Sequence, residues 1–406
     1  MLNLALIRED KVPVDRRVPI TPAQAADIQR RFPHVTVYCQ SSKHRCFPDQ
    51  DYRDAGIEVV DDVRHCDILM GVKEVPIPNL IAGKTYLFFS HTIKEQPYNR
   101  ELLRTILQKD IRLIDYERLT DEGGNRVVAF GRFAGIVGAY NGLYTYGKKL
   151  GLYDIRRAKD CFDMDDMRSE FSKITLPPIK IALTGGGRVG GGAAEVLEGV
   201  GIRRVSPAKY LTQTFSEPVF TQLEVTDYNQ KADKSSFAAE EFYQHPERFV
   251  PGFQPFTKVT DLFIAGAFWD HRAPVLFHRE DMLQDDFRIR VIADITCDIE
   301  GSIPSTKQPS TIADPVYDYD PQQDRVADTL YQNPALVSVM AVDNLPSELP
   351  RDASESFGSS LMEHVMPSLV SDGDAGVVER ATITESGQLT EAYQYLLDYV
   401  TGENGQ

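Results

Sequence analysis

A glycine-rich turn between an apolar strand and a helix of small residues is the feature that most restricts the fold. Residues 179–184 have the length and apolar content of a buried strand, GGGRVG follows at 185–190, and residues 193–199 read as a helix. This is the G-x-G-x-x-G pattern, whose glycines let backbone N–H groups approach a pyrophosphate at the positive end of a helix. The pattern predicts a dinucleotide-binding Rossmann domain, with a purely structural glycine turn as the alternative. The residues expected to contact the cofactor here are Gly185, Gly187, Arg188, Val189 and Gly190.

A further sheet is predicted before this domain, because strand-like runs alternate with helices over the first 120 or so residues. The apolar or β-branched runs lie at residues 2–7, 35–39, 57–60, 67–72, 85–90 and 111–116. Thr21 and Pro22 favour a helix over residues 23–31, and residues 96–108 form a second amphipathic segment. Alternation of this kind is typical of βαβ units and a parallel sheet.

The chain of 406 residues exceeds what one hydrophobic core usually organises, so two domains are expected. A glycine-rich helix at 131–151 leaves the first domain, and its glycines indicate close backbone packing. The acidic run at 160–170 reads as a solvated face. Beyond the glycine turn, strands are expected at 204–206, 261–265, 290–295 and 337–342, followed by a helix near 353–369.

Three titratable residues each follow a predicted strand of the first sheet. Lys73 comes after the run at 67–72, His91 after that at 85–90, and Glu117 after that at 111–116. Ligands bind at this edge of parallel sheets, so the three side chains are expected to converge. Lysine and histidine can exchange protons near neutral pH, and Glu74 and Glu117 are placed to tune their pKa values. A structural role for each residue is the alternative.

Arginines supply the candidate anion sites. Arg17 and Arg126 suit bidentate contacts with substrate carboxylates, although surface arginine is the alternative reading. A dinucleotide fold usually carries an acid about 20 residues after its first glycine, to bind the adenosine ribose. That position falls at Ser206, beside Arg204, and holds no carboxylate. Arg204 and Ser206 are therefore predicted to accept a ribose 2′-phosphate, which favours NADP over NAD, with a solvated surface charge at Arg204 as the alternative.

The bulk composition excludes several classes of protein. A formal net charge of -16 repels phosphate backbones and anionic membranes, so neither nucleic acid nor membrane is an expected partner. Five cysteines without CxxC spacing fit neither a disulfide framework nor a zinc site, and the histidines show no metal-ligand spacing. The sequence therefore predicts a cytoplasmic protein without a metal, and monomer and homodimer both remain open.

Several ordered motifs on both sides of the glycine turn carry a family resemblance. They are REDKVPVDRRVPITP at 8–22, GVKE at 71–74, FFSHTIK at 88–94, IDYE at 114–117, RVVAFGRFAG at 126–135 and DNLPSELPRDASE at 343–355. Together they resemble the lysine-forming saccharopine dehydrogenases of the alanine dehydrogenase superfamily. The likeness is closer still to the lysine-2-oxoglutarate reductase half of aminoadipic semialdehyde synthase.

The resemblance implies two Rossmann-like domains with mostly parallel sheets and an interdomain cleft. It implies a discontinuous first domain, residues 1–130 plus 345–400, around a dinucleotide-binding domain at 131–344. It also implies that Lys73 and His91 are the acid-base pair, with Glu74 and Glu117 modulating them and Arg17 and Arg126 near substrate carboxylates.

The activity predicted on this basis is a reversible, NAD(P)-dependent reductive condensation of L-lysine with 2-oxoglutarate to saccharopine. All three ligands are small molecules. An alanine-dehydrogenase-like or opine-type amino acid dehydrogenase is the rival enzyme, and a non-catalytic dinucleotide-binding regulator is the rival from another class.

Overall fold

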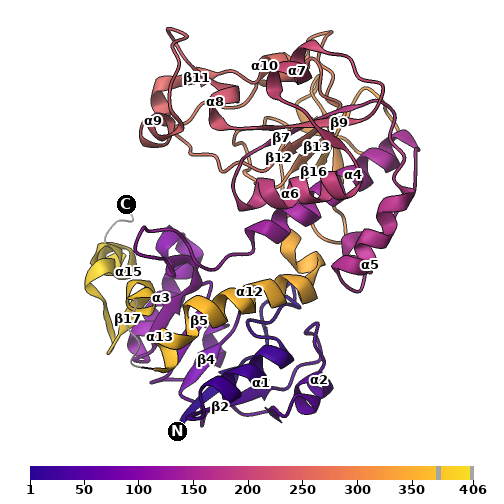
Figure 1. Cartoon of the computed structure of the whole chain (residues 1–406). Coiled ribbons are helices and arrows are strands. Elements are labelled where there is room, and N and C mark those ends of the chain that lie inside the picture. Colours follow the sequence, from indigo (N-terminus) through magenta and orange to yellow (C-terminus); the bar gives the residue numbers. More distant parts are fainter. Residues whose placement is uncertain (372–375, 403–406) are drawn as a thin grey trace. The chain divides into compact units, whose positions relative to one another are not determined.

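The computed structural model describes residues 1–371 and 376–402. The chain packs as two units, each with its own sheet (Figure 1). Unit 1 contains Met1–Ala129 and Pro350–Gln406, and unit 2 contains Phe130–Leu349. Unit 1 is therefore built from both ends of the chain. Among the described residues, no helix combines the length and the apolar character that crossing a bilayer requires.

The sheet of unit 1 has eight strands in the order β18-β17-β6-β5-β4-β1-β2-β3. Six are parallel and confirm the strands expected from the sequence: β1 (Leu2–Leu6), β2 (Val35–Gln40), β3 (Glu58–Val60), β4 (Ile68–Met70), β5 (Thr85–Phe88) and β6 (Arg112–Asp115). The C-terminal strands β17 (Thr382–Glu385) and β18 (Gln388–Leu389) extend the β6 edge in antiparallel fashion. Because β4, β5 and β6 are parallel neighbours, the loops that follow them emerge at one edge.

The helices of unit 1 begin where local signals place them. Thr21 caps α1 (Pro22–Arg31) with a capping box to Gln24, as its sequence predicts. The segment expected to be helical at 96–108 starts later, because a 3-10 turn at Pro97–Asn99 precedes α3. The other helices of the unit are α2 (Asp49–Asp54), α3 (Arg100–Gln108), α12 (Pro350–His364), α13 (Met366–Val370), α14 (Val377–Ala381) and α15 (Leu397–Thr401).

The sheet of unit 2 also has eight strands, in the order β15-β14-β16-β13-β12-β7-β9-β8. The strands are β7 (Lys180–Thr184), β8 (Arg203–Arg204), β9 (Val219–Leu223), β12 (Leu262–Ala265), β13 (Val291–Asp294), β14 (Val316–Asp320), β15 (Arg325–Val326) and β16 (Val337–Met340). Strands β9, β14 and β15 were not expected from the sequence. A separate antiparallel hairpin joins β10 (Asn229–Lys231) and β11 (Phe249–Pro251).

The two long helices of unit 2, α4 (Gly131–Leu150) and α6 (Arg188–Gly199), pack through glycines, which confirms the close backbone contact expected of residues 131–151. A Cβ on Gly135 would lie 1.8 Å from the Val189 carbonyl oxygen, and one on Gly192 would lie 2.0 Å from that of Arg132. The shorter helices are α5 (Met164–Ser169), α7 (Pro207–Thr212), α8 (Val225–Tyr228), α9 (Ala239–Gln244), α10 (Gln254–Thr257) and α11 (Arg279–Met282).

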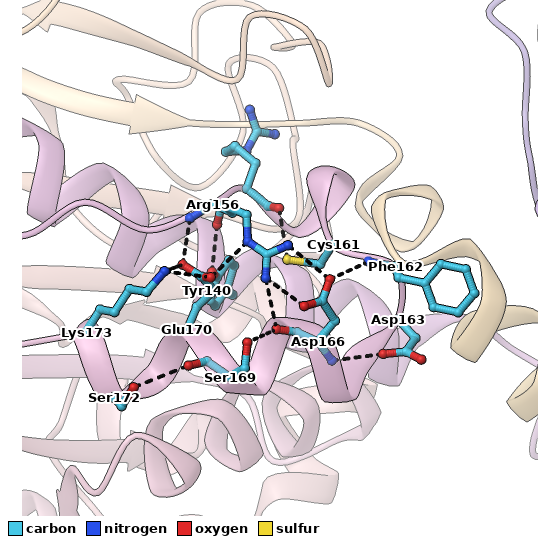
Figure 2. A network of polar contacts seen from close by, with 11 residues as sticks. Tyr140, Arg156, Cys161, Phe162, Asp163, Asp166, Ser169, Glu170, Ser172 and Lys173 are labelled. Atoms are coloured by element: carbon cyan, nitrogen blue, oxygen red, sulfur yellow. Dashed lines mark hydrogen bonds and ion pairs between the residues drawn. The ribbon is translucent and has the colours of Figure 1, made fainter.

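The acidic run at 160–170 was expected to be a solvated face, but it is only partly solvated. Glu170 is 2% exposed and pairs with Arg156 at 2.8 Å and with Lys173 at 2.8 Å. Figure 2 shows the Arg156 guanidinium held between the carboxylates of Glu170 and Asp166, with the latter at 2.7 Å. Tyr140 of α4 donates its hydroxyl hydrogen to the Arg156 carbonyl oxygen, so the network ties this segment to the long helix. Its role is structural.

Two largely parallel sheets, each with helices of its unit, confirm the α/β class and the Rossmann-like architecture predicted from the sequence.

Candidate active site

The glycine turn of unit 2 has the geometry of a dinucleotide cradle. It follows β7, and Gly187 is the N-cap of α6. Gly185 has φ +101°, a conformation that side chains other than glycine rarely adopt. A Cβ on Gly190 would lie 1.8 Å from the Gly185 carbonyl oxygen, so only glycine lets the helix approach the turn this closely. A Cβ on Gly187 would meet no atom within 4 Å. That open side at the positive helix end suits a pyrophosphate.

Two other predicted cofactor residues belong to the helix itself. Arg188 is the first residue of α6 and is exposed. Val189 is half-buried, its carbonyl faces Gly135 of α4, and its side chain lies near Gly266. Val189 therefore mainly packs the helix, and only its backbone remains at the turn.

The strand next to β7 differs from the one on which the spacing prediction relied. Strand β9, not β8, lies next to β7. Arg204 aligns with Phe220 near the start of β9, and Ser206 caps α7 through its hydroxyl oxygen. Arg204 thus lies toward the end of the strands opposite the glycine turn, because β9 runs parallel to β7 and Leu223 aligns with Thr184. The role of these two residues at a 2′-phosphate therefore stays a prediction.

A carboxylate stands beside the glycine turn. Glu224 follows β9 directly and is exposed. A Cβ on Gly186 would lie 2.1 Å from its Oε1 atom, so the carboxylate rests against the glycine turn. The spacing rule missed it because β8 and α7 intervene between α6 and β9.

The loop after β12 completes this edge of unit 2. A Cβ on Gly185 would lie 3.0 Å from the Ala267 nitrogen, which places the loop against the turn. Phe268 is 90% exposed, and Trp269 donates its indole hydrogen to the Pro274 carbonyl oxygen at 3.2 Å. Trp269 is the single tryptophan of the chain, so its fluorescence reports on this edge.

In unit 1 the predicted residues follow neighbouring strands, as expected. Glu74 joins one of them, His91, to Lys11. Its Oε1 atom lies 2.6 Å from His91 Nδ1, and its Oε2 atom accepts a hydrogen bond from Lys11 Nζ at 2.5 Å. Burial raises the pKa of Glu74, but the hydrogen bonds from His91 and Lys11 outweigh it and bring the pKa to about 2. Glu74 is therefore ionised at neutral pH. Lys11 was not among the predicted site residues.

The surroundings of Lys73 lower the pKa of its amine. Burial is the first cause that lowers its pKa, and the positive charge of Arg17 is the second. Arg17 itself is 3% exposed and pairs in bidentate fashion with Asp15, with Nε–Oδ1 at 2.9 Å and a second contact at 2.5 Å. The structure thus gives Arg17 a buried electrostatic position beside Lys73, and its contact with a substrate carboxylate stays a prediction.

His91 has φ +54°, an uncommon left-handed conformation for a non-glycine residue. Such strain persists only where the surroundings impose it, and it clusters at functional sites. Here Glu74 holds one side of the ring, and Phe89 stacks on it with the ring centroids 6.4 Å apart. The imidazole is thereby fixed in one orientation.

Glu117 and Arg126 form the other side of the cluster. Glu117 Oε1 lies 3.6 Å from Lys94 Nζ and 3.9 Å from an Arg126 nitrogen, while its buried Oε2 has no hydrogen-bond partner. The Arg126 guanidinium lies 5.9 Å from the centre of the Phe89 ring, and that ring also stacks on His91. A buried acceptor without a partner suits a ligand donor.

Glu9 is a residue that the sequence analysis missed. Its Oε1 atom accepts the Val72 N–H at 2.6 Å and its Oε2 atom accepts the Lys73 N–H at 2.9 Å. Burial raises the pKa of Glu9 to about 8. No sequence signal marked it, because the contact joins loops more than 60 residues apart.

Comparison with known proteins agrees with this geometry. Residues 5–137 match the family model described as alanine dehydrogenase/PNT, N-terminal domain. The first part of the chain is thus similar to that family's N-terminal domain. The sequence is 30% identical over 441 residues to the mitochondrial alpha-aminoadipic semialdehyde synthase of Rattus norvegicus. The aligned region covers 97% of this chain and 47% of that protein. The chain thus spans about half the length of that relative.

A relative of similar length is the saccharopine dehydrogenase [NAD(+), L-lysine-forming] of Neurospora crassa, 25% identical with 91% of each chain covered. Among solved structures, an L-alanine dehydrogenase has a TM-score of 0.66 at 16% identity, covering 98% of this chain and 100% of that one. The transhydrogenase from Sinorhizobium meliloti has a TM-score of 0.57 at 14% identity, and the match covers 96% of this chain and 98% of that one. The resemblance predicted from the sequence motifs, and its alanine dehydrogenase fold, are confirmed.

Proposed function

We propose that the protein is a saccharopine dehydrogenase that catalyses the reversible reductive condensation of L-lysine with 2-oxoglutarate. The observation that carries the proposal is the Lys73–Glu74–His91 cluster, in a chain similar to saccharopine dehydrogenases over most of its length. The fold neighbours alone do not select a substrate, because at their identities they indicate architecture only.

The reaction needs two proton transfers besides hydride transfer. The lysine ε-amine attacks the oxo carbon, the carbinolamine loses water to give an imine, and hydride addition to the imine carbon yields the secondary amine. One group of the chain takes the proton of the attacking amine, and another gives a proton to the departing hydroxyl. We assign these steps to Lys73 and His91, with Glu74 stabilising the protonated forms. A bound nicotinamide cofactor supplies the hydride.

The substrate carries carboxylates, and Arg126 is the group best placed to receive one. It is partly exposed and stacked on Phe89, so its guanidinium edge is presented beside the cluster. Glu117, with a buried oxygen that lacks a hydrogen-bond partner, would accept an amine hydrogen of the substrate. Arg17 would act on the site mainly through its charge.

We propose NAD as the cofactor. Glu224 stands at the ribose position, where a carboxylate accepts hydrogen bonds from the two hydroxyls and repels a 2′-phosphate. The Neurospora relative, whose name specifies NAD(+), supports this choice. Arg204, which with Ser206 favoured NADP by spacing alone, aligns with Phe220 near the start of β9.

The test is an omission assay. The protein should oxidise NADH in the presence of lysine plus 2-oxoglutarate, and not when either substrate is left out. Pyruvate with ammonia serves as the comparison, since an alanine dehydrogenase would use it. Faster turnover of pyruvate with ammonia would replace the proposal by that activity, and no turnover with intact NADH binding would favour a regulator.

We also propose a reducing compartment such as the cytoplasm, because all five cysteines are free thiols and at least partly buried. The rat relative is named as mitochondrial, so fractionation of cells that express the full-length protein distinguishes the two compartments.

A further inference from the structure

Glu9 connects two loops at the carboxyl edge of the unit 1 sheet. It lies just after β1, and the loop that carries Lys73 follows the neighbouring strand β4. Both carboxylate oxygens of Glu9 are used, one by the Val72 amide and one by the Lys73 amide. One side chain therefore satisfies two successive backbone donors of this loop.

The atoms of this contact pack closely against Gly71. A Cβ there would lie 3.2 Å from Glu9 Oε1 and 3.2 Å from side-chain atoms of Ile7, tighter than most such contacts. The Val72 carbonyl oxygen accepts the Phe89 amide hydrogen at 3.0 Å, which ties the same peptide to the loop that carries His91. The backbone before Lys73 is thus held from two directions.

We infer that Glu9 is a positioning residue that fixes the backbone of Lys73 and so sets where its amine stands. The inference rests on the proposed function. A lysine side chain has several rotatable bonds, so a loose backbone would add its own displacement to that of the side chain. Misplacement of a catalytic group by about 1 Å can cost about 10²-fold in rate.

The surroundings of Glu9 support a mainly neutral carboxyl at neutral pH. Burial raises its pKa to about 8; Asp15 adds to the rise, while the amides of Val72 and Lys73 and the charge of Arg17 oppose it. Tyr116 also lies within electrostatic range. Replacement by glutamine therefore changes little net charge near pH 7, and its main effect falls on the hydrogen bonds.

The test is Glu9→Gln in the full-length protein. The glutamine oxygen can accept one amide, but its NH₂ group would face the other amide, donor against donor. We expect kcat to fall about 10- to 100-fold with KM for NADH unchanged within about twofold. The pH-rate limb that belongs to Lys73 should move to higher pH, because a loosened lysine is better hydrated and its pKa rises toward the ordinary value.

Two further variants separate positioning from folding. Gly71→Ala crowds the Glu9 carboxylate without removing it, so it should also lower kcat, but by a smaller factor than Glu9→Gln. If Glu9→Gln does not fold, the kcat of Gly71→Ala tests the inference instead. Asp10→Asn is the matched control, since Asp10 is exposed and bonds Arg8 and Asn79. It should keep wild-type kcat.

Hydrogen exchange gives a readout that does not depend on activity. The Val72 and Lys73 amides should exchange slowly in the wild type, faster in Glu9→Gln, and slowly in Asp10→Asn. Wild-type kcat with an unmoved pH limb in both Glu9→Gln and Gly71→Ala, or unchanged exchange in Glu9→Gln, would overturn the inference. A wild type inactive with lysine plus 2-oxoglutarate would instead overturn the proposed function, and the exchange experiment would still test the contact.

Discussion

The side chains of Lys73 and His91 can be tested by replacements that keep bulk and remove ionisation. Lys73→Met and His91→Gln should each lower kcat by about 10²- to 10⁴-fold, because each removes a group that transfers a proton. The double variant should lose less than the product of the single losses, since the two groups act in one sequence of steps. NADH binding, followed by Trp269 fluorescence, should survive in all three.

Matched controls for this pair lie elsewhere in unit 1. Lys43 and His44 are adjacent and exposed, so Lys43→Met and His44→Gln should keep wild-type kcat. If Lys73→Met or His91→Gln kept near wild-type kcat and an unchanged pH-rate profile, that residue would have a structural role instead.

Glu74 makes stability depend on pH in a defined window. Its pKa is about 2 in the folded protein and about 4.5 for an unperturbed glutamate. A depressed carboxyl pKa stabilises the fold above the unfolded pKa, and this contribution is lost as pH falls from about 4.5 to about 2. With screening by solvent, we expect about 2 kcal/mol. Urea unfolding should show the wild type more stable than Glu74→Gln at pH 7, with the gap nearly closed at pH 2; an equal gap at both pH values would contradict this.

At the scale of elements, the packing of α4 on α6 depends on single glycines. Gly192→Ala should destabilise unit 2 by about 2 kcal/mol or more, because its Cβ would lie 2.0 Å from the Arg132 carbonyl oxygen. Gly191 is the matched control, since a Cβ there meets no atom within 4 Å. Gly191→Ala should stabilise the helix by about 0.5–1 kcal/mol. Thermal unfolding of the two variants measures the difference, and equal melting temperatures would contradict the packing.

The sequence predicted those elements whose pattern is local. Short apolar runs identified the parallel strands of unit 1, and Thr21 with Pro22 identified the start of α1. Strand β14 was missed because its sequence VYDYD looks polar. Its Asp318 is fully buried, where Ser338 donates to it and Lys149 lies at 3.7 Å. The helix expected at 353–369 is broken before Met366, consistent with Pro367 in the first turn of α13, which has no N–H to donate.

The preference for NADH over NADPH is predicted from the order of strands in unit 2, which puts Glu224 after the neighbour of β7. Glu224→Ser should lower the preference for NADH over NADPH, because it removes the carboxylate that excludes a 2′-phosphate. Arg204→Glu should leave that preference unchanged, since Arg204 lies at the other end of β9. The kcat/KM ratio for the two cofactors measures both variants. A large response to Arg204→Glu and none to Glu224→Ser would restore the assignment made from spacing.

At the scale of the whole molecule, sequence motifs located most candidate residues but not their partners. Lys73, His91 and Glu117 could be found because each follows a strand. Glu9 and Lys11 could not, because their contacts with the Lys73–Glu74 segment bridge more than 60 residues, and such pairs appear only once β1 and β4 are side by side. Glu224 was hidden for another reason, because β8 and α7 intervene between α6 and β9.

The central claim is that the protein joins lysine to 2-oxoglutarate with hydride from a nicotinamide cofactor. The most direct measurement incubates both substrates with NADH deuterated at the transferred position and analyses the product by mass spectrometry. The account predicts saccharopine, the sum of both substrates less one water plus two hydrogens, with one deuterium on the former oxo carbon and one NADH consumed per product. NADH oxidation without this adduct, or an adduct that carries no deuterium, would contradict it.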